Sequence, residues 1–322
     1  MVSAYPARSR SAWILAQRPA GRASPDPWAP HGIFLEKERL DSGVVVDSGV
    51  VLLTNKECPW RCLMCDLWKG TTKEKVPSGA VPHQVSLARR EWEATGALPA
   101  QVKLYNSGSF FDPSAIPHGD HAGIAAQLGF AANVVVESHP RLVGDGAARL
   151  RDMLKGGLEV AMGLETANER VLGLLNKGFG LEHFALASAR LRREGIPMRA
   201  FLLVNPPFLP PSEALDWVVR SADYAFSCGA TAVSLIPTRT GNGAMERLLE
   251  SGEFVPPTLS DLEVAQSRAI ALGKGRVFAD TWDLRQFSSC EHCLEKRVER
   301  LQSVNLEQQD LPLIPCGSCG QN

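Results

Sequence analysis

The chain has 322 residues, of which 44% are hydrophobic and 21% charged, a composition typical of a globular protein that can bury a substantial core. Its 34 Lys and Arg residues nearly balance 35 Asp and Glu residues, and the net charge of -1 excludes the overall basic character that dominates unaided nucleic-acid binding. No apolar run reaches the roughly 18 residues of a membrane span, which excludes a transmembrane helix.

The first element in chain order is an N-terminal extension, which we place at residues 1–42. Its first 25 residues contain four arginines and no acidic residue, a faint likeness to a transit peptide. Prolines flank its short apolar stretch. We therefore expect a flexible tail and keep targeting as the alternative.

From about residue 43 the chain alternates short β-branched runs with longer amphipathic stretches. The short runs are apolar almost throughout, which is typical of parallel strands covered on both faces. This pattern predicts seven strands, at residues 49–54, 102–105, 133–137, 158–164, 198–204, 232–236 and 276–279. Ranges between them, such as 181–195 and 212–226, carry apolar residues at helical spacing.

The alternation predicts an α/β fold, a parallel sheet or barrel with right-handed crossovers, over residues 43–284. In such folds, function sits on the loops after the carboxyl ends of the strands. The alternation stops after about residue 284, so residues 285–322 are predicted to form a separate cysteine-bearing segment.

Seven of the eight cysteines fall into tight clusters, which is typical of metal binding in a reducing compartment such as the cytoplasm. Cys58, Cys62 and Cys65 form a C-x3-C-x2-C loop directly after the first predicted strand. Three thiolates can bind three irons of a four-iron cluster and leave the fourth iron open to a ligand. Zinc is the alternative, but zinc usually takes paired C-x2-C clips.

This loop resembles the defining motif of the radical S-adenosylmethionine (SAM) enzymes. The resemblance implies a partial (β/α)6 TIM-like barrel, with a [4Fe–4S] cluster on Cys58, Cys62 and Cys65 and SAM bound at the open iron. It also implies reductive cleavage of SAM to a 5′-deoxyadenosyl radical, which abstracts hydrogen from a substrate. An electron donor such as flavodoxin or ferredoxin is then expected.

Further motifs narrow the resemblance. The stretches ESHPRLV and GLETANERVLGLLNKGF look like the radical SAM half of the Elongator catalytic subunit, whose acetyltransferase domain we expect to be absent. The stretches NSGSFFDP, LLVNPPF and GEFVPPTLSDLE look closer to the radical SAM subunit of archaeosine synthase. This likeness covers residues 43–264.

Polar residues after the second predicted strand are candidates for holding SAM. Asn106, Ser107, Gly108 and Ser109 stand where the family often has a Gly-Gly-Glu stretch that grips the SAM amino group. Hydroxyls and an amide replace the acid here, and a plain polar turn is the alternative. Gly108 would let the backbone approach a ligand closely.

Other strand ends supply the remaining cofactor candidates. Glu137 and Glu165 lie in apolar surroundings, where a carboxylate needs a partner. The partner would be the SAM ribose or ammonium, or Arg199 in an internal salt bridge. Arg199 would otherwise bind the SAM carboxylate. Asn205 and Thr238, also at strand ends, complete the cofactor-binding set.

The last segment contains two C-x2-C clips, Cys290 with Cys293 and Cys316 with Cys319. Two clips at this spacing indicate a tetrahedral site made of four thiolates. Zinc is the first choice and an auxiliary iron–sulfur cluster the second.

The leading hypothesis is a radical SAM enzyme that acts on an organic substrate. The archaeosine synthase likeness favours a modified base or nucleoside in tRNA, and the neutral charge favours a partner subunit that would help bind it. A small molecule or a peptide remains an open substrate class. Two other functions also stay open: an iron–sulfur electron carrier and a non-catalytic zinc-binding module.

Overall fold

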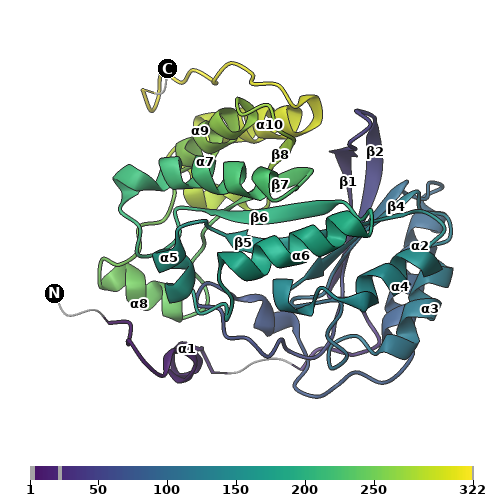
Figure 1. The fold of residues 1–322 in the computed structure, drawn as a ribbon. Helices are drawn as coiled ribbons and strands as arrows, with labels where there is room; N and C mark the ends of the chain where they lie inside the picture. The colour runs from purple at the N-terminus through teal and green to yellow at the C-terminus, as the bar shows by residue number, and fades with distance from the viewer. Residues whose placement is uncertain (1–3, 21–23, 321–322) are drawn as a thin grey trace.

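A curled sheet of eight strands dominates the computed structural model, which describes residues 4–20 and 24–320 (Figure 1). The strands follow one another across the sheet in chain order. β1 pairs antiparallel with β2, and all later pairings are parallel. The strands are β1 (Gly32–Arg39), β2 (Val45–Leu52), β3 (Gln101–Tyr105), β4 (Asn133–Ser138), β5 (Gly157–Glu165), β6 (Met198–Val204), β7 (Ala232–Pro237) and β8 (Arg276–Ala279).

Helices connect the parallel strands and cover the outer face of the sheet (Figure 1). The helices of the described residues are α1 (Arg10–Gln17), α2 (Ala80–Ala94), α3 (His121–Gln127), α4 (Asp145–Met153), α5 (Glu169–Leu174), α6 (Leu181–Arg193), α7 (Pro211–Ser227), α8 (Ala244–Glu250), α9 (Leu259–Ile270) and α10 (Glu291–Glu307). Of these, α1 precedes the sheet and α10 follows its last strand. Short 3-10 helices are η1 (Leu67–Gly70), η2 (His118–Asp120), η3 (Pro140–Leu142) and η4 (Leu284–Phe287). The predicted α/β half-barrel is confirmed.

The sequence analysis missed β1, which lies within the range predicted to be an extension. Its residues, GIFLEKER, combine few apolar residues with four charges, so no apolar run marks the strand. The charges of Glu36 and Glu38 are accommodated because both side chains face the interior of the curl, where Lys103 pairs with each of them. The sheet therefore begins at Gly32, although the boundaries of the three predicted domains remain predictions.

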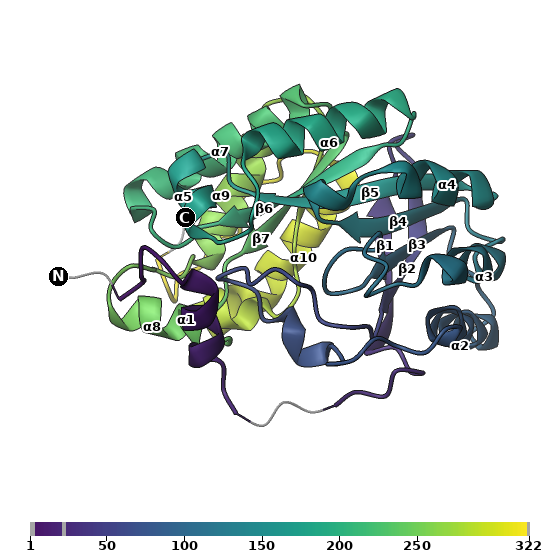
Figure 2. The same cartoon turned by 60° about the horizontal axis from the view of Figure 1, so that its bottom comes forward.

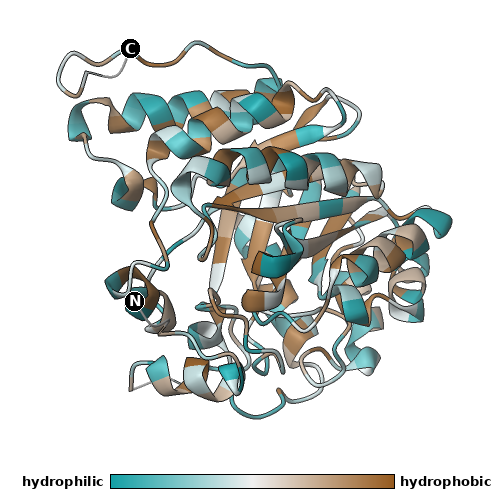
Figure 3. Cartoon of the chain, turned by 60° about the vertical axis from the view of Figure 1, so that its left-hand side comes forward, coloured by the Kyte–Doolittle hydropathy of each residue, from teal (hydrophilic) through white to brown (hydrophobic). Residues whose placement is uncertain are grey.

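Side chains alternate along each parallel strand between the helix-covered face and the interior of the curl, which we call the lumen. On β3, Val102 and Leu104 join the main apolar core together with Trp92 of α2, while Lys103 points into the lumen toward β1. In Figure 3 the strands are mainly brown, and the helices carry teal bands on their solvent side. The apolar core thus lies between sheet and helices, and the lumen is left for polar groups.

A network of buried charges fills the amino-terminal end of the lumen. Arg199 of β6 is 2% exposed and crosses the lumen to reach Glu38 of β1, with Nη2···Oε1 at 2.5 Å. The same guanidinium bonds Glu159 of β5 through Nε at 2.6 Å. Burial alone would raise the pKa of Glu38, but Arg199 and Lys103 hold it well below the ordinary value. These groups close one end of the barrel, so the other end is the one that can admit ligands.

The outer edge of β8 is closed by α10 rather than by another strand. The side-chain amide of Asn305 accepts a hydrogen bond from Ala279 N at 2.8 Å and donates one to Ala279 O at 2.9 Å. Gln308 pairs with Val277 in the same way, at 2.7 and 3.0 Å. Two side-chain amides therefore take the place of a neighbouring strand.

The N-terminal segment is ordered where the structure describes it. Tyr5 and Ile14 are buried against Met245 and Leu248 of α8, and α1 lies beside α8 in Figure 2. This packing differs from the expected flexible tail, since a few large apolar side chains suffice to anchor it. In the part of the chain that the structure describes, no helix is long and apolar enough to cross a membrane.

Candidate functional site: the carboxyl ends of the strands

The unusual residues of the sequence gather at the carboxyl ends of the parallel strands, where polar loops replace apolar strand. Several residues other than glycine adopt left-handed backbone conformations in these loops, among them Ser107 after β3 (φ +54°), Glu165 at the end of β5 (φ +67°) and Asn205 after β6 (φ +52°). Such conformations are strained and cluster at binding and active sites. Three of the predicted cofactor-binding residues therefore occupy strained positions.

The three-cysteine loop follows β2, and all three of its cysteines are half-buried. Burial raises the pKa of the Cys58 thiol to about 12, of Cys62 to about 11 and of Cys65 to about 12. The positive charge of Lys177 partly opposes each of these shifts. Thiols with such high pKa values become ligands only when a metal displaces their protons.

Side chains from distant loops hold the backbone of the cysteine loop. Asn242 donates to Leu63 O at 2.8 Å and to Cys65 O at 3.2 Å, and Asn176 donates to Arg61 O at 2.7 Å. Sequence reasoning missed both asparagines, although Asn176 stands in the quoted stretch GLETANERVLGLLNKGF. The cysteines are thus carried by a loop whose carbonyl groups are fixed from two sides.

Trp60 fixes the same loop through its ring. The indole stacks on the imidazole of His139, with centroids 3.6 Å apart and planes 7° from parallel. His139 is itself fixed, because Nδ1 accepts from Arg141 N at 3.2 Å and Nε2 then donates to Lys177 O at 2.9 Å. Burial lowers the pKa of His139 to about 4, so the ring is neutral and serves as a support.

Gly108 lies directly against the cysteine loop. A Cβ at this position would come within 3.2 Å of the Cys58 Cβ, so the close approach favours glycine. Asn106, two residues earlier, is fully buried, and neither its side-chain nitrogen nor its side-chain oxygen has a hydrogen-bond partner. An amide in this state is ready to bond a ligand, since an unpaired buried polar group is unfavourable.

The two predicted glutamates have different partners. Glu137 accepts hydrogen bonds from Asn106 N at 2.5 Å and Gly108 N at 3.4 Å, so it fixes the loop that approaches the cysteines. Burial raises the pKa of Glu137 to about 7, and these backbone bonds limit the shift. Glu165 pairs with Lys177 at 2.5 Å. Neither carboxylate pairs with Arg199.

The remaining predicted residues divide into two groups. Asn205 is buried with an unpartnered Oδ1, which suits a ligand. Ser109 and Thr238 have internal partners instead, Ser138 Oγ at 3.0 Å and Val204 O at 2.8 Å. Arg199 is placed apart from the whole set, because it is the second residue of β6 and lies at the opposite end of the lumen. We therefore leave Arg199 out of the cofactor-binding set.

The N-terminal segment also contacts the cysteine loop. Arg18 bonds Glu57, next to Cys58, at 2.8 Å, and its guanidinium lies over the Trp68 ring at 4.4 Å. Ile14 and Leu63 belong to the same buried cluster. The segment therefore helps to form the site, which its composition did not indicate.

The four C-terminal cysteines form a second cluster. All four sulfurs lie within 4.8 Å of one another, with Cys290 Sγ···Cys316 Sγ and Cys293 Sγ···Cys319 Sγ both at 3.9 Å. Backbone amides of Cys319 and Ser318 lower the pKa of Cys316 to about 6. The predicted four-thiol arrangement is present and has the chemistry of a metal site. The eighth cysteine, Cys228, is half-buried at the end of α7.

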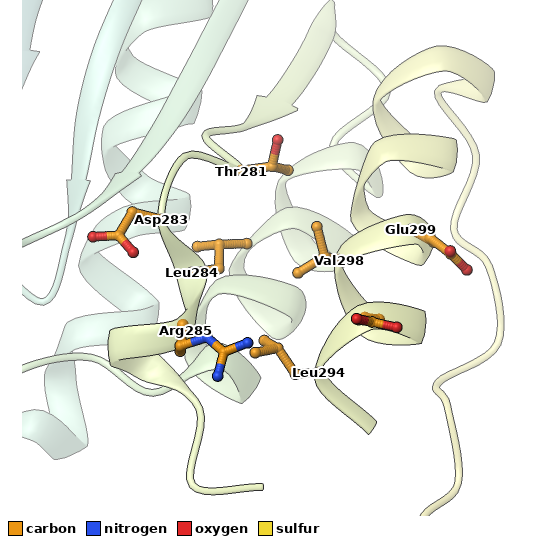
Figure 4. A pocket seen from close by; sticks show the side chains of 8 residues that line it. Thr281, Asp283, Leu284, Arg285, Leu294, Val298 and Glu299 are labelled. Atoms are coloured by element: carbon orange, nitrogen blue, oxygen red, sulfur yellow. The ribbon is translucent and has the colours of Figure 1, made fainter. Parts of the chain in front are cut away.

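A cavity of about 360 Å³ lies between η4 and α10 (Figure 4). Leu284, Leu294 and Val298 line it with apolar surface, while Asp283 and Glu299 lie on its rim. It includes no residue of the cysteine loop and none of Ser107, Glu165 and Asn205. The cavity is therefore separate from the candidate site.

No protein-family model matches the chain. Among curated proteins, the archaeosine synthase subunit beta of Methanosarcina acetivorans is 25% identical over 294 residues, covering 86% of this chain and 84% of the relative. The subunit of the same name from Thermococcus kodakarensis is 29% identical over 211 residues, covering 62% and 63%. An uncharacterized protein of Methanocaldococcus jannaschii is 24% identical over 301 residues, covering 86% and 82%.

Two solved structures have a similar fold. Archaeal Elp3 from Methanocaldococcus infernus superimposes with a TM-score of 0.53 at 13% identity, covering 69% of this chain and 59% of that one. A radical SAM methyltransferase from Sphaerobacter thermophilus gives 0.52 at 13% identity, covering 78% and 77%. The chain is therefore similar to radical SAM enzymes in fold and to archaeosine synthase beta subunits in sequence, which confirms the resemblance first seen in its cysteine loop.

Proposed function

We propose that the protein is a radical SAM enzyme whose [4Fe–4S] cluster is held by Cys58, Cys62 and Cys65. The observation that carries the proposal is the isolation of these three half-buried thiols on one loop after β2, at the carboxyl ends of the strands. The other five cysteines lie elsewhere, four in the C-terminal cluster and Cys228 directly after α7. When bound, the cluster would supply the electron that cleaves SAM to the radical that removes hydrogen from the substrate.

The residues around the loop fit the amino-acid part of SAM. Glu165 and Lys177 present one negative and one positive charge, and SAM carries an ammonium and a carboxylate. Asn106 and Asn205 offer buried amide atoms without partners. We assign these four residues to SAM, and we assign Glu137 and Gly108 to the positioning of the loop that carries Asn106.

For the substrate we propose a modified nucleoside in tRNA. The support is the name of two relatives, archaeosine synthase subunit beta. The word subunit and the net charge of -1 together favour a partner protein that contributes to tRNA binding. A low-potential donor such as flavodoxin or ferredoxin would provide the electron.

For the C-terminal cluster we propose one zinc ion. A tetrahedral Zn²⁺ with Zn–S bonds of about 2.3 Å places its sulfurs about 3.8 Å apart. The two observed separations of 3.9 Å match this value. In an iron–sulfur cubane each thiolate binds a different iron, which spreads the sulfurs further apart.

Anaerobic purification followed by iron, sulfide and zinc analysis tests both metal assignments. We expect about four irons and one zinc per chain. With dithionite and SAM, the reconstituted protein should release 5′-deoxyadenosine. Cys62→Ala should abolish this release, and Cys228→Ala is the matched control that should keep it. A protein that carries zinc without iron would be a non-catalytic module, and iron without SAM cleavage would indicate an electron carrier.

A further inference from the structure

The described N-terminal residues, 4–20, pack against the candidate site, and we call them the strap. α1 lies within the strap and runs beside α8 (Figure 2). Ile14 of α1 is 3% exposed and shares a buried cluster with Leu63 of the cysteine loop, which is fully buried. The strap therefore lies directly against the loop that carries the three thiols.

A series of charged side chains connects the strap to Cys58. Arg18 of the strap bonds Glu57 at 2.8 Å, and only 15% of each side chain is exposed. A second partner of Glu57 is Arg61, at 3.3 Å. Arg61 in turn donates to the carbonyl oxygen of Cys58 and, at 3.0 Å, to that of Trp60. Arg18 thus acts on the backbone of a predicted cluster ligand through two intermediate side chains.

The strap also contacts two further loops. Asn176 donates to Ser11 Oγ at 3.1 Å through the same nitrogen that donates to Arg61 O. Gln17 passes so close to Gly243 that a Cβ on the glycine would lie 1.8 Å from Gln17 O. Position 243 must therefore be glycine for the strap to lie where it does.

Each anchor point of the strap stands next to a residue of the candidate site in the sequence. The three adjacent pairs are Glu57 with Cys58, Asn176 with Lys177, and Gly243 with Asn242. Separate loops supply the pairs, one after β2, one after α5 and one after β7. A single segment that contacts all three loops limits their freedom to move relative to one another.

We propose that the strap positions the cysteine loop for its cluster and that Arg18 is the positioning residue. Without Arg18, the Glu57–Arg61 pair that holds the carbonyl oxygen of Cys58 loses its anchor. A metal site needs its ligands held within a fraction of an ångström by the groups behind them, so a looser loop retains the cluster poorly. The proposal rests on the proposed function, because it names what holds the proposed cluster ligands in place.

Gly243→Ala tests the strap without changing any residue within it. The added methyl group would overlap Gln17 O and should displace the strap. Gly241→Ala is the matched control, because both glycines have left-handed backbones, with φ +116° at Gly241 and +86° at Gly243. A Cβ on Gly241 would meet nothing closer than Lys69 Nζ, at 3.7 Å.

Alkylation of the full-length, iron-free protein by iodoacetamide, followed by mass spectrometry, measures how freely the loop moves. Gly243→Ala and Arg18→Met should each raise the alkylation rate of Cys62 about tenfold, since a hydrogen bond between charged groups is lost. Gly241→Ala should leave this rate near the wild-type value. Arg18→Lys keeps a cation for Glu57 and should restore most of the protection. Cys228 is the reference outside the site, and its rate should stay unchanged in all variants.

After reconstitution, Gly243→Ala and Arg18→Met should also lose iron to a chelator about tenfold faster than the wild-type protein. Equal alkylation of Cys62 in Gly243→Ala and Gly241→Ala would overturn the proposal. A parallel rise at Cys228 would overturn it as well, because it would indicate general loosening of the fold. The alkylation assay needs no cluster. A protein with the expected alkylation rates that binds no iron would therefore refute the radical SAM assignment while supporting the docking of the strap on the cysteine loop, so the two failures are distinguishable.

Discussion

Replacing Arg199 with methionine should destabilise the protein by about 3–5 kcal/mol at pH 7.5. Methionine keeps most of the side-chain volume but leaves Glu38 and Glu159, 4% and 3% exposed, without their shared cation. Glu38 keeps Lys103 and Glu159 keeps Arg276 at 3.5 Å, so two cations are left for the three carboxylates Glu36, Glu38 and Glu159. The one uncompensated charge is the source of this magnitude. For a chain of this size the melting temperature should fall by roughly 10 °C.

The pH dependence of this loss has a defined sign. In the folded wild-type protein the pKa of Glu38 is lowered, so its contribution to stability is full above its ordinary pKa of 4.5 and is lost as the pH falls through the folded value. In Arg199→Met that pKa is no longer held down by Arg199. The difference in unfolding free energy between the two proteins should therefore be largest near pH 7.5 and smaller at pH 4.

Urea denaturation at both pH values measures the effect. Arg268→Met is the control, because Arg268 pairs with Asp216 on the surface at 52% exposure and should change stability by less than about 1 kcal/mol. SAM binding should survive in folded Arg199→Met. A variant of normal stability that fails to bind SAM would refute the structural role and restore Arg199 to the cofactor site.

Three other predictions concern the loop and the tail. Asn242→Ala should lower cluster content after reconstitution, measured as iron per chain, since Leu63 O and Cys65 O lose their donor; an unchanged iron content would show that the loop needs no such support. Cys316→Ala should abolish zinc binding and lower the melting temperature while leaving the iron content unchanged, and loss of iron instead would mean that the tail holds a cluster. Asn305→Leu should increase the rate of aggregation, measured by light scattering, because the backbone of Ala279 at the edge of β8 loses both hydrogen-bond partners. An aggregation rate equal to that of the wild-type protein would contradict this.

The sequence predicted the parallel strands because each is a short run of mainly apolar residues. A β-branched run such as NVVVE is typical of a buried strand. It did not predict β1, whose inward side chains are charged and whose partners come from β3 and β6. The ionic network depends on side chains that meet across the lumen, and no spacing along the chain reveals such contacts.

The candidate site was only partly predictable for a related reason. The cysteine spacing is local, so the loop was found. The supports Trp60, Asn176 and Asn242 act through tertiary contacts and were missed. Arg199 was assigned to the site by residue type, although its place at the start of β6 put it at the closed end of the barrel. Position within a strand was the signal that would have corrected it.

The closure of β8 by α10 has a consequence for the order of folding. Asn305 and Gln308 stand at the carboxyl end of α10. The edge of β8 therefore stays open until α10 has formed and docked. In the folded chain the cysteine clip at the start of α10 lies against the clip of the tail. During synthesis the newly formed sheet therefore passes through a stage in which a bare strand edge is available to other chains. The zinc ion proposed above would join the start of α10 to the tail, and it would thereby help to keep α10 over the strand edge.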